Sequence, residues 1–138
     1  MVALLGIGSA AAQESAATLV GIASVQDGDG LLFGQVEVRL QGIAAPEMRQ
    51  PMGRESYFGL VQLIEGKEVR CELDGTVANR RPVGVCFIAG RDIGRVQVAA
   101  GLARDCAGYS KGRYRDDEIQ ARTEGKDLSQ VYDLPGYC

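Results

Sequence analysis

Charged side chains that can act on an anionic group recur in the stretch VQDGDGLLFGQVEVRLQGIAAPE, residues 25–47. Asp27 and Asp29 fall in a tight glycine turn, Arg39 falls in a strand-like run, and Glu47 follows a proline. Carboxylates bind hard divalent cations and accept protons. A planar guanidinium group pairs with phosphate or carboxylate through two parallel hydrogen bonds. The stretch therefore has the residue types needed for chemistry on an anionic substrate.

Histidine is absent from the 138 residues. This excludes Ser/His/Asp and Cys/His nucleophilic schemes and every histidine-ligated metal site, so chemistry must use carboxylates, arginines, lysines or a hard metal. A protein that contacts many phosphates is usually strongly basic, whereas the net charge of this chain is −3. A local basic pocket is compatible with this charge. We therefore expect weak, local contact with DNA or RNA and a monomer.

Strand-like runs position the charged residues of the first half of the chain. Residues 18–25 and 31–33 predict two strands around the acidic turn, and residues 35–43 alternate strictly. This alternation places Val36, Val38 and Leu40 on one face and Glu37, Arg39 and Gln41 on the other. Arg39 is therefore predicted to leave the core face.

The remaining elements complete a small barrel. Apolar spacing predicts helices over residues 53–65, 92–100 and 114–124, and the runs 67–73 and 82–88 predict a hairpin. This order favours an α+β, mainly β, fold: a five-stranded OB-fold-type barrel with about three appended helices, stapled by disulfides. We assign this single domain to residues 18–138.

The first residues are interpreted as a processing segment. Residues 1–12, MVALLGIGSAAA, are uncharged and end in small residues, which is typical of a truncated signal peptide; a floppy terminus is the alternative. The run is too short to span a membrane. Residues 13–17 form a linker.

The four cysteines are Cys71, Cys86, Cys106 and Cys138. Their even number and the lack of C-x-x-C spacing favour two disulfides over a zinc site, and a secreted or periplasmic location over buried thiols in a cytosolic domain. Cys71 and Cys86 can face each other across the predicted hairpin, and Cys106 with Cys138 would tether the tail. Four cysteines allow three connectivities, so the pairing stays open.

The order of the motifs resembles the thermonuclease, or staphylococcal nuclease-like, family over residues 18–125. The motifs are DGD, VRLQGI-AAPE, EVRC, a loop ending in Arg81, VGVC, and GLA before a tyrosine. The resemblance implies a calcium-dependent phosphodiesterase on an OB-fold barrel. By position, it implies Asp29 and the backbone carbonyl of Ala45 as metal ligands, with Asp27 near the ion but not bound to it. It implies Arg39 and Arg81 as the arginines that neutralise the phosphate, and Glu47 as the base that orients or activates water. Tyr109 matches a tyrosine that contacts the nucleotide.

The sequence departs from the family's pattern at the expected metal site. Ala44 stands where the family usually has a second metal-binding aspartate, and Ala45 and Gly30 stand where it has threonines. Calcium takes six to eight oxygen ligands, so we expect weakened calcium binding, with another divalent ion as an alternative. Arg81 is preferred to Arg80 by counting back from VGVC.

Two main functions are compatible with these residues. The first is metal-assisted, nuclease-like hydrolysis of phosphodiester bonds in nucleic acid. The alternative is a non-catalytic OB-fold module that binds nucleic acid or another anionic ligand; a domain that serves a protein partner is a third reading. Taken alone, Arg39 also fits a solvated cross-strand partner of a glutamate, and Tyr109 also fits a packing residue.

Overall fold

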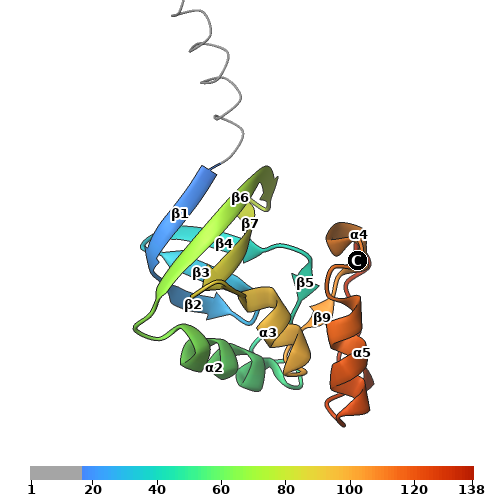
Figure 1. The fold of residues 1–138 in the computed structure, drawn as a ribbon. Helices are drawn as coiled ribbons and strands as arrows, with labels where there is room; N and C mark the ends of the chain where they lie inside the picture. The colour runs from blue at the N-terminus through green and yellow to red at the C-terminus, as the bar shows by residue number, and fades with distance from the viewer. Residues whose placement is uncertain (1–16) are drawn as a thin grey trace, which may run out of the picture.

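The computed structural model describes residues 17–138 and shows a curled sheet with helices along one end and one side (Figure 1). This confirms the mainly β, OB-type α+β fold. The segment expected to be signal-like, residues 1–12, and the linker up to residue 16 lie outside the described residues. Within residues 17–138, no helix is long and apolar enough to cross a membrane.

The main sheet has the strand order β1-β6-β7-β4-β3-β2, with β8 added beside β7. The strands are β1 (Ala17–Ile22), β2 (Ser24–Asp27), β3 (Gly30–Phe33), β4 (Val36–Leu40), β6 (Glu68–Ala78), β7 (Arg81–Ile88) and β8 (Arg91–Asp92). Neighbours are antiparallel except β4 and β7, which are parallel. β1 and β2 are two halves of one strand, interrupted at Ala23, that pair with opposite ends of the sheet. Counted as one bent strand, they complete, with β3, β4, β6 and β7, the five strands that were expected.

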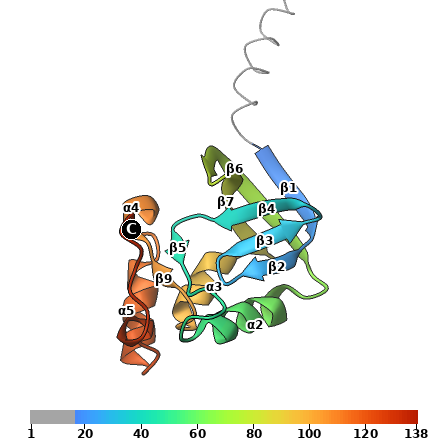
Figure 2. The same cartoon turned by 180° about the vertical axis from the view of Figure 1, so that it is seen from behind.

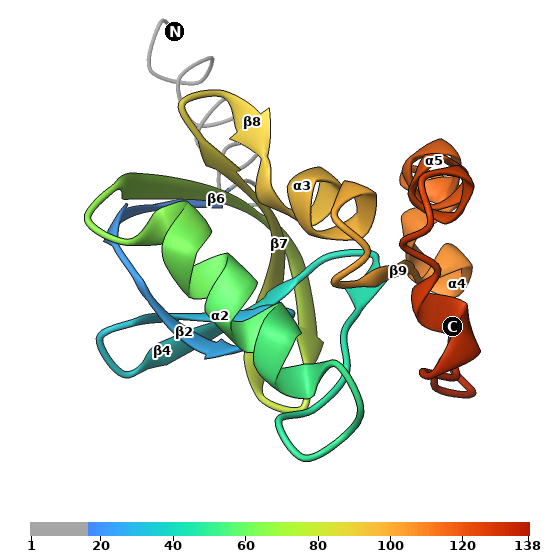
Figure 3. The same cartoon turned by 90° about the horizontal axis from the view of Figure 1, so that it is seen from below.

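Three predicted helices are confirmed within one or two residues. They are α2 (Gly53–Ile64), α3 (Ile93–Ala99) and α5 (Arg115–Thr123). Figure 3 shows α2 lying across one end of the curled sheet, where its buried Leu60 and Ile64 join the main core with Leu31, Val38 and Val69. The sequence analysis did not anticipate five short elements: β8, β5 (Ile43–Ala44), β9 (Arg104–Asp105), α4 (Ala107–Ser110) and the 3-10 helix η1 (Leu128–Gln130).

A second, smaller core lies beside the barrel. β5 pairs with β9, and this pair links the barrel to α4, α5 and the end of the chain, as the views from the front and from behind both show (Figures 1 and 2). Its buried members are Ala44, Cys106, Leu128 and Tyr132. The end of the chain is thus packed against the strand that follows Arg39.

Both favoured disulfides are present. Cys71 and Cys86 are directly opposite in the β6–β7 ladder and are buried, as the strand pattern predicted. Cys106 and Cys138 join the start of α4 to the last residue. On the chain-entropy model, each bond stabilises the fold by about 3 to 4 kcal/mol.

The hairpin before Arg81 is tighter than expected. The sequence analysis placed a loop there, whereas β6 continues to Ala78 and β7 begins at Arg81. Asn79 and Arg80 form the two-residue turn, and both have positive φ (52° and 68°), the conformation that two-residue hairpin turns favour. Arg81 therefore sits on a strand rather than in a mobile loop.

Candidate active site

The acidic turn between β2 and β3 is clamped between two helices. A Cβ on Gly28 would overlap the Ser56 hydroxyl of α2, so only glycine allows this approach. Gln97 of α3 is 1% exposed, and its amide donates to the Gly28 carbonyl (3.0 Å) and to the Ser56 carbonyl (3.3 Å). The turn that carries Asp29 is therefore rigidly placed.

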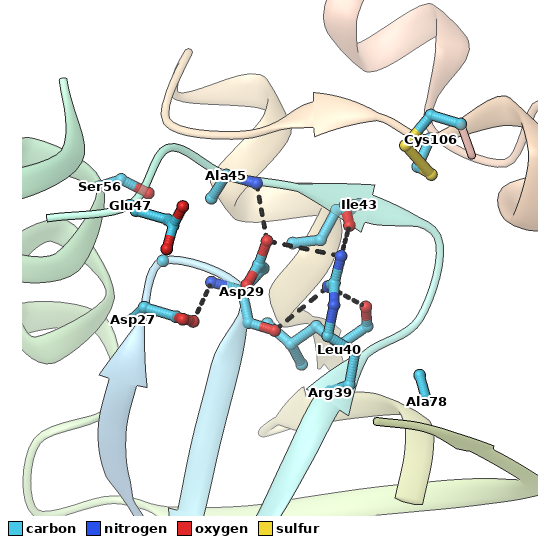
Figure 4. Close-up of polar contacts among 12 residues, drawn as sticks. Asp27, Asp29, Arg39, Leu40, Ile43, Ala45, Glu47, Ser56, Ala78 and Cys106 are labelled. Atoms are coloured by element: carbon cyan, nitrogen blue, oxygen red, sulfur yellow. Dashed lines mark hydrogen bonds and ion pairs between the residues drawn. A yellow bond between two sulfur atoms is a disulfide. The ribbon is translucent and has the colours of Figure 1, made fainter. Parts of the chain in front are cut away.

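Asp29 is buried at the centre of the site. Its Oδ2 accepts a hydrogen bond from the Ala45 amide (2.8 Å) and lies 3.5 Å from Nη2 of Arg39. Figure 4 shows Asp29 with Arg39 on one side and Asp27 and Glu47 on the other. Burial raises the pKa of Asp29 to about 7, and nearby Asp27 adds to this while Arg39 opposes it. Burial therefore disfavours the ionised form of Asp29, and the ion pair with Arg39 works against this.

Arg39 ties the strands of the site together. Nη1 donates to the carbonyls of Leu40 (2.8 Å) and Asp29 (3.3 Å), and Nη2 donates to the carbonyl of Ile43 (2.7 Å). The side chain leaves the apolar core face, as predicted, but it is only 9% exposed rather than solvated. Most N–H groups of the Arg39 guanidinium thus donate to the protein itself. These bonds fix the position of the side chain and leave few N–H groups for a ligand.

Arg81 is the more available guanidinium. Its Nη1 pairs with Oε2 of Glu37 (3.1 Å), and its Nε donates to the carbonyl of Ala78 (3.1 Å). Its Nη2 has no hydrogen-bonding partner among residues 17–138. Arg80 lies at the exposed tip of the hairpin and does not line the site, so the structure brings Arg81, and not Arg80, to the pocket.

Glu47 is held through its backbone. A Cβ on Gly53 would overlap the Glu47 carbonyl, so glycine at the start of α2 lets the loop fold back on the helix. The Glu47 amide donates to Oε1 of Gln50 (2.7 Å), and the Gln50 amide donates to the Glu47 carbonyl (2.9 Å). Within residues 17–138 its carboxylate has no hydrogen-bonding partner, so it is free to accept a proton.

These side chains line one cavity of about 670 Å³. Its walls include Asp27, Asp29, Glu37, Arg39, Ala45, Glu47, Gln50, Arg81, Tyr132, Asp133 and Tyr137. An adjoining cavity of about 440 Å³ shares Arg39, Asn79, Arg81 and Tyr137 and is lined by more apolar groups. Tyr109 belongs to this second cavity, is 57% exposed, and meets the ring of Tyr137 edge-on at 6.0 Å between centroids.

The residues present do not form a complete calcium site. Within residues 17–138, no three acidic or cysteine side chains are placed to hold a metal ion. The position of the missing aspartate, Ala44, is 1% exposed and faces the smaller core. Asp29 is already paired with Arg39, so the oxygen ligands that calcium needs are not assembled by the protein alone.

Several residues that line or support the site were not singled out from the sequence. Glu37 shares the polar strand face with Arg39, so the alternation itself could have indicated it. Gln97 carried no signal beyond an apolar helix pattern. Tyr132 comes from the far end of the chain, and no local pattern connects it with Asp29.

Together, the fold and the site define an OB-type barrel whose cavity combines two arginines with an acidic turn. No family model matches the chain. It is 32% identical over 126 residues (83% of this chain, 66% of the relative) to "Succinoglycan biosynthesis protein ExoI" of Rhizobium meliloti. It is 30% identical over 81 residues (59% of this chain, 25% of the relative) to "Staphylococcal-like nuclease CAN1" of Arabidopsis thaliana. It is 48% identical over 42 residues (30% of this chain, 11% of the relative) to "Probable staphylococcal-like nuclease CAN3" of Oryza sativa subsp. japonica.

These similarities confirm the resemblance to the staphylococcal nuclease-like family. The chain is nuclease-like at the family level. It spans 66% of the first relative and a quarter or less of the two nucleases.

Proposed function

We propose that the chain hydrolyses phosphodiester bonds of DNA or RNA in the cavity around Asp29. The observation that carries this proposal is the meeting of Arg39, Arg81 and the Glu47 carboxylate in one cavity of a nuclease-like chain. That carboxylate has no hydrogen-bonding partner in the part of the chain that the structure describes. A phosphodiester carries negative charge, and its in-line displacement places further charge on the equatorial oxygens. Fixed guanidinium groups stabilise that charge without reorganising.

Each residue has a role in this proposal. Arg81 binds the phosphate through its free Nη2, and Arg39 contributes positive charge from beside Asp29. Glu47 takes a proton from a water whose oxygen attacks phosphorus; the P–O bond to the leaving sugar oxygen breaks, and that oxygen takes a proton from solvent. Tyr109 offers an exposed ring for a base in the adjoining cavity.

A divalent ion has a place in this proposal beside Asp29. Asp29 and the Ala45 carbonyl are the ligands that the resemblance implies, and an ion bound there, calcium or another, would take most of its ligands from water. Such binding would be weak. None of the roles given to Arg39, Glu47 and Arg81 depends on the ion.

The proposal is tested by cleavage of labelled single-stranded DNA and RNA with calcium, magnesium, manganese or EDTA. We expect cutting by the oxidised protein, and a loss of about 100-fold or more in kcat/KM for Glu47→Gln and for Arg81→Gln, since each removes a transition-state interaction. Arg80→Gln is the matched control, because it removes the same charge one residue away from the cavity. Equal activity of Arg80→Gln and Arg81→Gln would contradict the role of Arg81.

A non-catalytic, anion-binding module is the second candidate. It is favoured by the engagement of Arg39 with three backbone carbonyls and by the alanine at position 44. If no ion supports cutting while the labelled oligonucleotide still binds, this candidate is correct. In either case we infer a secreted or periplasmic monomer, a location supported by the two disulfides.

A further inference from the structure

The tail segment, residues 131–138, forms one wall of the candidate active site. Tyr132, Asp133, Pro135 and Tyr137 line the cavity that holds Asp29 and Arg39. The staphylococcal nuclease-like motifs lie within residues 18–125, so this wall comes from outside the part of the chain that carries the resemblance.

The tail segment is held firmly at both ends. At residue 132, the backbone amide donates to the Leu128 carbonyl (3.0 Å), and the carbonyl accepts from Nη1 of Arg104 (3.1 Å). At residue 138, the carbonyl accepts from the Gly108 amide (2.7 Å), and the side chain is bonded to Cys106. Figure 4 shows this disulfide close to the strand that carries Ile43. The wall is therefore a fixed part of the folded protein.

Tyr132 brings a phenol to the wall of the cavity that also holds Asp29 and Arg39. It is 7% exposed and packs in the smaller core together with Ala44. Within residues 17–138, its hydroxyl makes no hydrogen bond, whereas every fully buried side-chain oxygen of these residues has a hydrogen-bonding partner. The Tyr132 hydroxyl is therefore not fully buried, and we infer that it opens to the cavity that Tyr132 lines. A tyrosine phenol has an ordinary pKa of about 10, so it is neutral at physiological pH and keeps a proton to donate.

We propose that Tyr132 is a substrate-binding residue whose phenolic O–H donates a hydrogen bond to a phosphate oxygen of a nucleic acid bound beside Arg39. This inference rests on the proposed function and adds the tail segment to the site. A phenol in the cavity wall supplies a neutral donor, whereas a carboxylate there would supply a negative charge. A neutral donor suits a site that binds the phosphate with arginines and does not assemble the oxygen ligands of a cation.

The variant Tyr132→Phe tests this role because it removes the hydroxyl and keeps the ring that packs on Ala44. Tyr57→Phe is the matched control, since Tyr57 of α2 is half-buried outside both cavities. The probes are a fluorescent single-stranded oligonucleotide with phosphorothioate linkages, which resists cleavage, and its uncharged methylphosphonate counterpart. Binding of each probe is measured by fluorescence anisotropy. Cleavage is measured with an unmodified oligonucleotide, and the stability of each variant is measured by thermal melting.

We expect Tyr132→Phe to bind the charged probe about tenfold more weakly than the wild type, because a hydrogen bond to a charged group is lost. Its binding of the uncharged probe and its melting temperature should match those of Tyr57→Phe. If Tyr132→Phe binds the charged probe within twofold of the wild type, the inference is overturned, even if the protein cuts nucleic acid. If the wild type binds and never cuts, while Tyr132→Phe binds more weakly, the inference stands and the hydrolytic function falls. A wild type that neither binds nor cuts overturns both.

Discussion

Restoring the family's aspartate at position 44 should damage this protein rather than repair a calcium site. The side chain of Ala44 is 1% exposed and faces the smaller core with Cys106, Leu128 and Tyr132. The variant Ala44→Asp places a carboxylate against these groups. It would lie in the smaller core, out of reach of solvent and beside Cys106 and Leu128, whose side chains offer it no hydrogen-bond donor.

The size of the penalty follows from Asp29 in the same site. Burial is the main cause that raises the pKa of Asp29 from its ordinary 3.8 to about 7, which corresponds to about 4 kcal/mol. The three extra heavy atoms add a packing cost of about 1 to 3 kcal/mol. We therefore expect Ala44→Asp to lower the free energy of unfolding by about 4 kcal/mol or more at pH 8.

The assay is urea denaturation between pH 4 and pH 8, with and without calcium. The introduced carboxyl has a higher pKa in the folded than in the unfolded state, so its penalty is small near pH 4 and grows as the pH rises towards the folded-state value. Ala44→Asn is the control, because it adds similar bulk without charge and its penalty stays constant with pH. The reasoning is refuted if Ala44→Asp is as stable as the wild type and calcium stabilises it further.

Two more predictions concern the residues that hold the site together. Arg39→Met should lower the free energy of unfolding by about 3 to 5 kcal/mol in urea denaturation, because it leaves Asp29 buried without its partner; a loss below about 1 kcal/mol would show that the ion pair is not structural. Replacing Cys71 and Cys86 together by alanine should cost about 3 kcal/mol by the same measurement, since the bond closes a loop of 15 residues; unchanged stability would contradict the chain-entropy account.

The sequence predicted those features that local pattern controls. Strict alternation over residues 35–43 placed Arg39 off the core face, and the hairpin placed Cys71 opposite Cys86, because side-chain direction in a strand has a period of two. The Ile43 carbonyl that accepts from Arg39 was out of reach, since β5 only takes its position by pairing with the distant β9. Tyr132 was missed for a similar reason: it lines one cavity with Asp29, about one hundred positions away, and no local sequence pattern around either residue indicates this.

We expect the tail segment to make the site a late product of folding. Strands β1–β4, β6 and β7 and helix α2 lie within residues 17–88, and their pairing needs nothing from the tail segment. The wall that carries Tyr132 is completed when Cys138 reaches Cys106, and disulfide formation takes seconds to hours, far longer than strand pairing. Newly made chains would therefore pass through a stage with a formed barrel and an open-sided cavity, and the oxidising capacity of the surroundings would set how long that stage lasts.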